Sequence, residues 1–321
     1  MASSTAPFTH IRGVLLPAPW LAWLFVVDAI LSLLLPLKAV LPDAVYHISS
    51  VLAESVWLWI QRIFEIKNGA TIAISGDSLP RGESAIVVAN HVAWSDFYMI
   101  QAVAHRSGML GRCRWFAKIQ LRWVPLLGWG LWAMEMPMVS RKWMKDQVEL
   151  DKVFKGIVER ERPVWLISFS EATRFTPKKK ADSDAWCAAN GRPQPQHLLY
   201  PRTKGFVTTV QHLRRAPHIR AVYDLAIAYE HDGCWQEAPS MWETLSLPRL
   251  SLPLSLKDSY GARSGGQGFR FEVHVRRFAI EELPSDDEAL AKWLEHRWLE
   301  KGQWLEAKKS EWASLDPKKI R

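Results

Sequence analysis

The chain has 321 residues, of which 48% are hydrophobic and 23% charged, a composition that excludes a disordered protein and allows one sizeable core. The formal net charge of +8 fits an anionic partner, such as a lipid surface or a phosphorylated substrate. The sequence argues against nucleic acid, because it has no zinc-finger spacing, no basic region with heptads and no RNA-recognition signature. The three cysteines lie far apart, so they predict neither a disulfide framework nor a zinc site.

The N-terminus is apolar. Residues 14–37 contain one acidic residue, Asp28, and approach the ~20 residues that a membrane-spanning helix needs. A cleaved signal peptide is the alternative, but Arg12 alone makes a thin basic region and no clear cleavage site follows. Residues 45–64 are apolar with polar interruptions, which favours an amphipathic helix at a membrane interface. We therefore expect residues 1–67 to form a membrane-anchoring segment.

The 18 tryptophans point the same way, because Trp is enriched where an apolar medium meets water. A Trp-rich core is the alternative. We favour the interface for three clusters: Trp20/Trp23, Trp57/Trp59 and Trp293/Trp298/Trp304/Trp312. The basic tail over residues 305–321 fits contact with anionic lipid and a solvated tail equally well.

After residue 67, short β-branched runs alternate with helical patterns. The spacing predicts strands over 71–75, 84–89, 163–169, 219–229 and 269–278, and helices over 146–160, 203–213 and, behind a capping box at 285–288, up to 304. Loops are expected over 176–196 and 232–268. This alternation predicts an α/β fold, with a layered catalytic domain over 68–304 in which a mixed sheet is flanked by helices.

A first candidate site follows the strand at 84–89. His91 and Asp96 stand five positions apart, which is about 140° around a continuous helix, so they can meet only if a turn separates them and a helix starts near Ser95. Histidine suits proton abstraction from a hydroxyl near neutral pH, and a carboxylate can hold the imidazole in the required tautomer. The spacing alone fits a structural histidine as well.

Three further stretches carry anion-binding side chains. Glu171, Thr173 and Arg174 follow the strand at 163–169, where an Arg fork suits phosphate oxygens. Lys204 lies in Tyr200-Pro-Arg-Thr-Lys-Gly-Phe206, at the start of a predicted helix, which also makes an anion site. Arg141 ends an apolar stretch. Taken singly, Glu171 and Arg174 fit a surface salt bridge better than an anion site, and Lys204 also fits simple loop solvation.

As an ordered set, these blocks resemble the glycerolipid acyltransferase superfamily, in its lysophosphatidic acid and lysophosphoinositide/lysocardiolipin branch. Asn90-His91 to Asp96 is similar to the family's His-x4-Asp motif, and Met138–Arg141 to its second block. Ser170-Glu-Ala-Thr-Arg174 resembles Pro-Glu-Gly-Thr-Arg, with Ser170 and Ala172 in place of Pro and Gly. Residues 199–206 are similar to Leu-Pro-Arg-Thr-Lys-Gly-Phe. The added Cβ at position 172 disfavours a positive φ there and puts the shape of the loop in question.

The resemblance implies an acyl-CoA-dependent acyltransferase that esterifies the free hydroxyl of a lysophospholipid. His91 would be the general base and Asp96 would orient it. Acceptor binding is implied for Arg141, Glu171, Thr173, Arg174, Pro201 and, more weakly, Lys204. No metal and no cofactor are expected, because the thioester of acyl-CoA is already activated. The resemblance also implies attachment to a membrane, specifically that of the endoplasmic reticulum.

Lysophosphatidic acid is the leading acceptor, which would make the product phosphatidic acid. Lysophosphatidylinositol, lysocardiolipin and glycerol 3-phosphate are the alternatives. A catalytically inactive lipid-binding protein is an alternative from another class, and the intact His91/Asp96 pair argues against it. A serine hydrolase is disfavoured, because the sequence has no Gly-x-Ser-x-Gly elbow.

Overall fold

The structure is a computed structural model, and it describes residues 6–125, 127–140, 143–251 and 268–314. The helices are α1 (Ala6–Leu15), α2 (Ala18–Leu34), α3 (Pro42–Arg62), α4 (Asp96–Arg106), α5 (Leu127–Ala133), α6 (Trp143–Arg160), α7 (Pro177–Ala189), α8 (Thr203–Leu213), α9 (Met241–Ser246) and α11 (Asp287–Ser314). Short 3-10 helices are η1 (Pro36–Ala39), η3 (Leu110–Arg112), η4 (Ile119–Trp123) and η5 (Ile280–Glu282), and a π-helical turn, η2 (Ile63–Lys67), extends α3.

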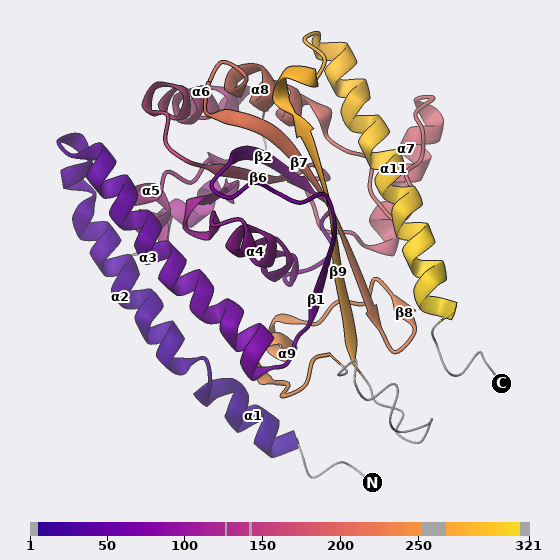
Figure 1. Cartoon of the computed structure of the whole chain (residues 1–321), viewed down its shortest axis with the longest axis horizontal. Coiled ribbons are helices and arrows are strands. Elements are labelled where there is room, and N and C mark those ends of the chain that lie inside the picture. The colour runs from indigo at the N-terminus through magenta and orange to yellow at the C-terminus, as the bar shows by residue number, and fades with distance from the viewer. Residues whose placement is uncertain (1–5, 126, 141–142, 252–267, 315–321) are drawn as a thin grey trace.

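A twisted mixed sheet lies at the centre of the molecule (Figure 1). Its strands are β1 (Ile72–Gly76), β2 (Ser84–Ala89), β3 (Cys113–Trp115), β6 (Trp165–Phe169), β7 (Ile219–His231), β8 (Cys234–Trp235) and β9 (Phe269–Ala279), and a separate pair is β4 (Ala117–Lys118) and β5 (Met138–Val139). The order is β1-β9-β7-β2-β6-β3. The neighbours β7, β2, β6 and β3 run parallel, whereas β9 runs antiparallel to β7. This confirms the predicted α/β fold with a mixed sheet between helices.

Two apolar layers cover the sheet. Helices α2, α3 and α4 pack on one face, and α6, α8 and α11 pack on the other (Figure 1). Strand β2 is buried along its whole length, as are most residues of β7, so both strands read as continuous apolar runs instead of alternating ones. That composition is why the sequence revealed them as strands.

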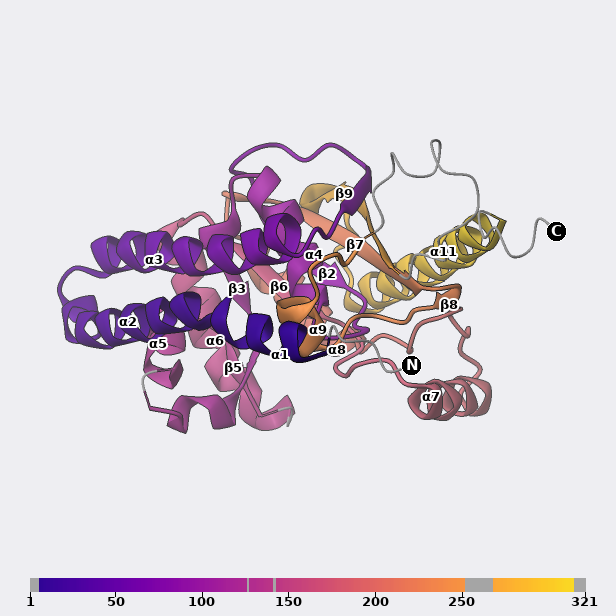
Figure 2. The same cartoon turned by 90° about the horizontal axis from the view of Figure 1, so that it is seen from below.

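The N-terminal apolar stretch folds as two helices. A break at Pro17 separates α1 from α2, because proline has no N–H to continue the hydrogen-bond ladder. Within the described residues, Thr9–Leu34 is long and apolar enough to cross a membrane, and only 17% of that window is buried. The amphipathic helix predicted over 45–64 corresponds to α3, which packs against the domain. Figure 2 shows α2 lying beside α3. The Trp20 and Trp23 indoles donate to Val56 O and Ser55 Oγ of α3.

Three expectations about local structure were wrong. Residues 177–189 form helix α7 and not a loop, because Thr176 caps the helix with its side chain and Pro177 occupies its first turn. Helix α11 runs to Ser314, ten residues beyond the predicted end at Trp304. Its cap is Asp286, whose side chain accepts from Ala289 N, and not Ser285. Residues 252–267 of the predicted loop over 232–268 lie outside the described residues, and α9 forms in the described part behind a Ser240/Glu243 capping box.

The C-terminal tryptophans are core residues, so the interfacial interpretation of that cluster was wrong. Trp298 is fully buried and Trp312 is 6% exposed, both within the apolar layer that α11 closes over the sheet. Trp293 stacks on Phe206 of α8. The α11 face therefore supplies the second core of the domain.

A buried ion pair fastens α11 to the sheet. Lys301 Nζ lies 2.6 Å from Asp224 Oδ1 of β7 and donates to Leu225 O at 3.0 Å, while its ammonium group sits over the Trp298 ring. Both charged side chains are almost fully buried. Lys301 and Asp224 compensate each other's charge away from water, so the loss of one partner leaves the other as an unpaired buried charge.

We expect Lys301→Met to lower the free energy of unfolding by about 3–5 kcal/mol, because Asp224 would then be buried without a cation. The double variant Lys301→Met/Asp224→Asn should recover most of that loss. Urea denaturation followed by circular dichroism measures both. A single variant within about 0.5 kcal/mol of wild type would contradict the proposed role of the pair.

Candidate active site

The candidate base lies just beyond the carboxyl end of β2. Asn90 prolongs the pairing of β2 with β7 by one residue, because its side-chain amide donates to Ile227 O at 3.0 Å and accepts from Ile227 N at 2.7 Å. His91 is therefore the first side chain clear of the sheet. The carboxyl edge of parallel strands is where ligands commonly bind in open α/β folds.

His91 and Asp96 are in direct contact, as the sequence predicted. His91 Nδ1 lies 2.7 Å from Asp96 Oδ2. Residues 90–95 form the required turn, and α4 begins at Asp96 with Ser95 as its N-cap. This turn brings the His91 and Asp96 side chains together despite their five-residue spacing.

The Asp96 carboxylate is fully buried and held by four donors. Val92 N and Ala93 N donate to Oδ2 at 2.7 and 3.1 Å, beside His91. Tyr229 of β7 donates its hydroxyl to Oδ1 at 2.7 Å. Burial and the Asp96 charge raise the pKa of Tyr229 well above its ordinary value, so the phenol remains a donor. The carboxylate is thereby fixed in one orientation.

The His91 ring is partly open. Its side chain is 14% exposed, and one face stacks on Phe169 with the ring centroids 3.9 Å apart. Because an ionised Asp96 carboxylate can only accept hydrogen bonds, the proton of a neutral His91 imidazole is assigned to Nδ1, which donates to Asp96 Oδ2. Nε2 then keeps its lone pair for a substrate proton. Phe169 ends β6 and pairs in register with Ala89 of β2, which explains why it reaches the ring.

The loop after β6 runs alongside His91. Phe175 N donates to His91 O at 2.7 Å, and Ala172 N donates to Phe169 O at 2.9 Å. Lys179 of α7 donates to Thr173 Oγ1 and to Arg174 O, which fixes the backbone of this loop. The Arg174 side chain is exposed, and within the described residues its guanidinium has no ion-pair partner. It is available to bind an anion beside His91.

Ala172 adopts the left-handed conformation, with φ of +57°. The Cβ of an alanine disfavours this conformation, which a glycine adopts readily. The structure keeps the positive φ, at a cost of about 1–2 kcal/mol for a residue with a Cβ. The hydrogen bond to Phe169 O and the burial of the neighbouring Glu171 hold the backbone there. The loop after β6 thus forms a turn with serine at position 170 and alanine at position 172.

Glu171 is buried under the loop and does not reach the surface. Its residue is 3% exposed, and Leu199 N donates to Oε2 at 3.4 Å. Burial raises the pKa of this carboxyl to about 8, against the opposing effect of the Leu199 N–H. The raised pKa favours the protonated, neutral form of Glu171 near neutral pH. Its predicted contact with an acceptor stays a prediction, and the observed position instead suits support of the loop.

The segment before α8 is hydrogen-bonded to the loop that follows β6. Arg202 N donates to Ser170 O at 2.7 Å, which places the buried Pro201 next to the β6 loop. Lys204 is exposed in the first turn of α8. Arg141 lies outside the described residues. The structure thus brings together His91, Asp96, Glu171, Thr173, Arg174 and Pro201, and gives Lys204 a place near this edge without a contact to His91.

Sequence reasoning missed two contributors to the site. Tyr229 stood in a strand that was read only as core, and Phe169 was read as the end of a buried strand. Both lie at the carboxyl edge of strands adjacent to β2, so the strand order would have located them. Among the described residues, no three or more His, Cys, Asp or Glu side chains gather in a way that could hold a metal ion.

Two family models match the chain. The model described as acyltransferase matches residues 71–230, and the model described as acyltransferase C-terminus matches residues 264–310. The first includes every described site residue. The second falls largely on β9 and α11.

Curated relatives carry related descriptions. The chain is 29% identical over 263 residues to the 1-acyl-sn-glycerol-3-phosphate acyltransferase 2 of Arabidopsis thaliana, covering 81% of this chain and 61% of the relative. It is 31% identical over 224 residues to the human 1-acyl-sn-glycerol-3-phosphate acyltransferase delta, covering 70% and 53%. The chain thus spans between about half and three fifths of the length of these relatives.

Among solved structures, the 1-acyl-sn-glycerophosphate acyltransferase from Thermotoga maritima matches with a TM-score of 0.45 and 14% identity, over 88% of this chain and 95% of the other. The sequence matches carry the assignment. From the two family models and the relatives in plants and animals, the chain belongs to the glycerolipid acyltransferase family.

Proposed function

We propose that the protein transfers an acyl group from acyl-CoA to the free hydroxyl of lysophosphatidic acid, forming phosphatidic acid. The observation that carries this proposal is the His91 Nδ1 to Asp96 Oδ2 contact, which leaves Nε2 free at an open edge of the sheet. The names of the relatives support lysophosphatidic acid as the acceptor. Lysophosphatidylinositol and lysocardiolipin are the alternative acceptors.

The reaction needs one base and no covalent enzyme intermediate. His91 Nε2 takes the proton of the acceptor hydroxyl as its oxygen attacks the thioester carbonyl. Asp96 stabilises the imidazolium that forms, and Tyr229 and the Val92 and Ala93 amides hold Asp96 in position. The tetrahedral intermediate then collapses, the carbon–sulfur bond breaks, and the departing CoA sulfur takes the proton from His91. The base is thereby regenerated.

The acceptor phosphate would be bound by Arg174. Its guanidinium is exposed and unpaired in the described part of the chain, and its loop is joined to the His91 backbone by Phe175 N. A guanidinium can bind phosphate oxygens through two parallel hydrogen bonds. Lys204 at the α8 N-terminus and Arg141 would add positive charge to the same head-group site. Thr173 and Pro201 would shape it.

We further propose that residues 1–67 attach the catalytic domain of residues 68–304 to a membrane, with the endoplasmic reticulum as the expected location. The apolar window Thr9–Leu34 supports this attachment. Exposed apolar side chains on α1 and α2 support it too, among them Leu15 at 66%, Phe25 at 55% and Leu33 at 77% exposure. A membrane would cover apolar surface of this extent, which soluble monomers rarely expose.

Replacing the base tests the chemistry. We expect His91→Ala to lower kcat by about two to four orders of magnitude, the usual contribution of a positioned base. The measurement is release of CoA from oleoyl-CoA when lysophosphatidic acid is added to protein in detergent, with the product identified by mass. His105→Ala, an exposed histidine on α4, is the matched control and should retain wild-type turnover. Unchanged turnover in His91→Ala would rule out the assigned role.

Arg174 is tested through substrate affinity. We expect Arg174→Ala to raise KM for lysophosphatidic acid about tenfold, with KM for acyl-CoA unchanged, because a charge-assisted contact contributes about 1.5–3 kcal/mol. Arg106→Ala, at the opposite end of α4, is the control for loss of one exposed arginine. If Arg174→Ala and the wild type had equal KM values for each phosphate-bearing acceptor in a panel, Arg174 would not belong to the head-group site.

The protonation of Glu171 predicts a pH effect on stability. Its folded-state pKa of about 8 lies above the ordinary value of 4.5, so the protein binds this proton more tightly when folded. The stabilisation is fully present below pH 4.5 and is lost as the pH rises through about 8. We expect Glu171→Gln, which is neutral throughout, to flatten this decline in thermal melts between about pH 5 and pH 8. A variant whose melting temperature falls as steeply as that of wild type would show that Glu171 is charged in the folded protein.

A further inference from the structure

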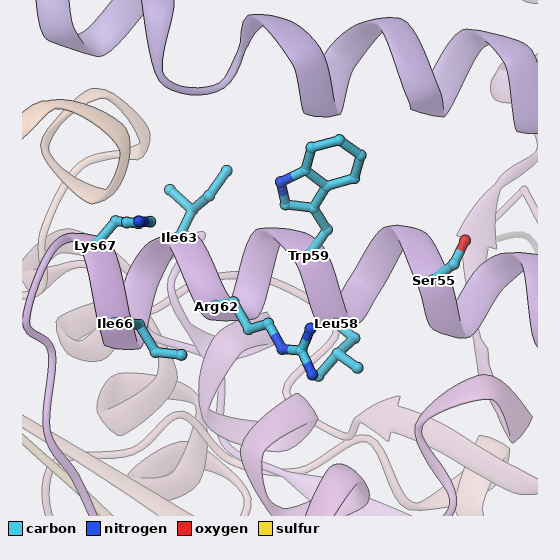
Figure 3. Close-up of a pocket in the computed structure, with 7 residues that line it drawn as sticks. All are labelled: Ser55, Leu58, Trp59, Arg62, Ile63, Ile66 and Lys67. Atoms are coloured by element: carbon cyan, nitrogen blue, oxygen red, sulfur yellow. The ribbon is translucent and has the colours of Figure 1, made fainter.

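A groove lies along one face of α3 and of the π-helical turn η2 that follows it (Figure 3). Its volume is about 620 Å³, within the range of about 300–1,000 Å³ typical of small-molecule sites. The lining residues recur at helical spacing: Ser55, Leu58, Trp59, Arg62, Ile63, Ile66 and Lys67. None of them belongs to the site around His91.

The groove combines apolar surface with uncompensated positive charge. Trp59 is 39% exposed and Ile66 is 69% exposed. Arg62 and Lys67 are exposed as well, and their side chains have no ion-pair partner in the described ranges of the chain. An inorganic anion would compensate the charges but leave the indole and Ile66 in water. A purely apolar partner would cover these side chains but leave both cations unpaired.

The N-terminal helices border the groove at both ends. Trp23 of α2 donates to Ser55 Oγ at 2.9 Å, and Arg12 of α1 donates to Lys67 O at 2.8 Å. Figure 3 shows Trp59 and Ile63 projecting toward the α1–α2 segment, whereas Arg62 lines the same groove and projects away from that segment. The groove therefore adjoins the two helices that carry the exposed apolar side chains of the membrane segment.

We propose that this groove binds one anionic phospholipid of the membrane, with its phosphate between Arg62 and Lys67 and an acyl chain over Leu58, Trp59 and Ile66. The inference rests on the membrane attachment proposed above. An amphiphile with a negative head compensates the cations and covers the apolar side chains at once. Such a combination of a cationic edge and an aromatic, apolar face is typical of helices that lie at a lipid interface.

The bound lipid would fix how the catalytic domain sits on the bilayer. On the other side of α3, Gln61 is buried and donates to Tyr98 O in the first turn of α4. Asp96 begins that same helix. The helix that holds the lipid is thus packed against the helix that holds the catalytic carboxylate, so the groove sets the position of the active site relative to the membrane surface.

The test is photo-crosslinking of the full chain. Phosphatidic acid with a photoreactive acyl chain is mixed into phosphatidylcholine vesicles, and labelled peptides are identified by mass spectrometry. We expect labelling to concentrate in residues 55–67 and to fall about five- to twentyfold in Arg62→Gln/Lys67→Gln, since each cation near an anionic lipid contributes roughly a fivefold effect. Lys152→Gln/Lys155→Gln removes the same charge from exposed positions on α6 and should label like wild type.

Three results would overturn the lipid site. They are equal labelling of residues 55–67 by photoreactive phosphatidylcholine, no labelling of residues 55–67 by phosphatidic acid, and competition by inorganic phosphate for that labelling, which would indicate an anion site without a lipid. Labelling in mixed micelles is run in parallel, so that the groove is tested even if the protein fails to sediment with vesicles. His91→Ala should be labelled like wild type, which separates this site from any failure of the proposed acyl transfer.

Discussion

The buried carboxylate of Asp96 is the constraint on which the site depends. A carboxylate removed from water is costly unless donors replace the water, and here the donors come from three places in the chain. Two are the amides of Val92 and Ala93, one is the ring of His91, and one is the hydroxyl of Tyr229 on a neighbouring strand. Because each donor must point at the same group, the turn between β2 and α4 has little freedom. Because His91 Nδ1 is bonded to this fixed carboxylate, the imidazole is held in one orientation as well.

The sheet order makes this convergence possible. Strand β2 lies between β6 and β7, and all three run parallel, so their carboxyl ends meet at one edge. From that edge β2 contributes His91, β6 contributes Phe169 and the Arg174 loop, and β7 contributes Tyr229. Residues separated by more than a hundred positions therefore share one site. The antiparallel β9 pairs with β7 further out, and the long α11 closes the second core, where the Lys301–Asp224 pair joins it to β7.

The sequence was most informative where local physics decides the outcome. The boundaries of β2 and α8 were predicted to the residue, because a continuous β-branched run and a helical apolar pattern leave few alternatives. The spacing of His91 and Asp96 alone left their meeting open, and the resemblance to the His-x4-Asp motif supplied that prediction. The position of Tyr229 depends on strand order, which no local pattern encodes. The C-terminal tryptophans show the same limit, since an amphipathic pattern does not say whether a sheet or a bilayer covers its apolar face.

Glu171 and Ala172 show how the loop after β6 keeps its form despite an unusual sequence. A glycine would enter the left-handed region without cost, whereas alanine there costs about 1–2 kcal/mol. The strain persists because neighbours on both sides are fixed: Phe169 stacks on His91, and Glu171 is buried against Leu199. The neutral form of Glu171 lowers the cost of burying it. Alanine therefore holds a left-handed turn only two residues before Arg174, the side chain proposed to bind the acceptor phosphate.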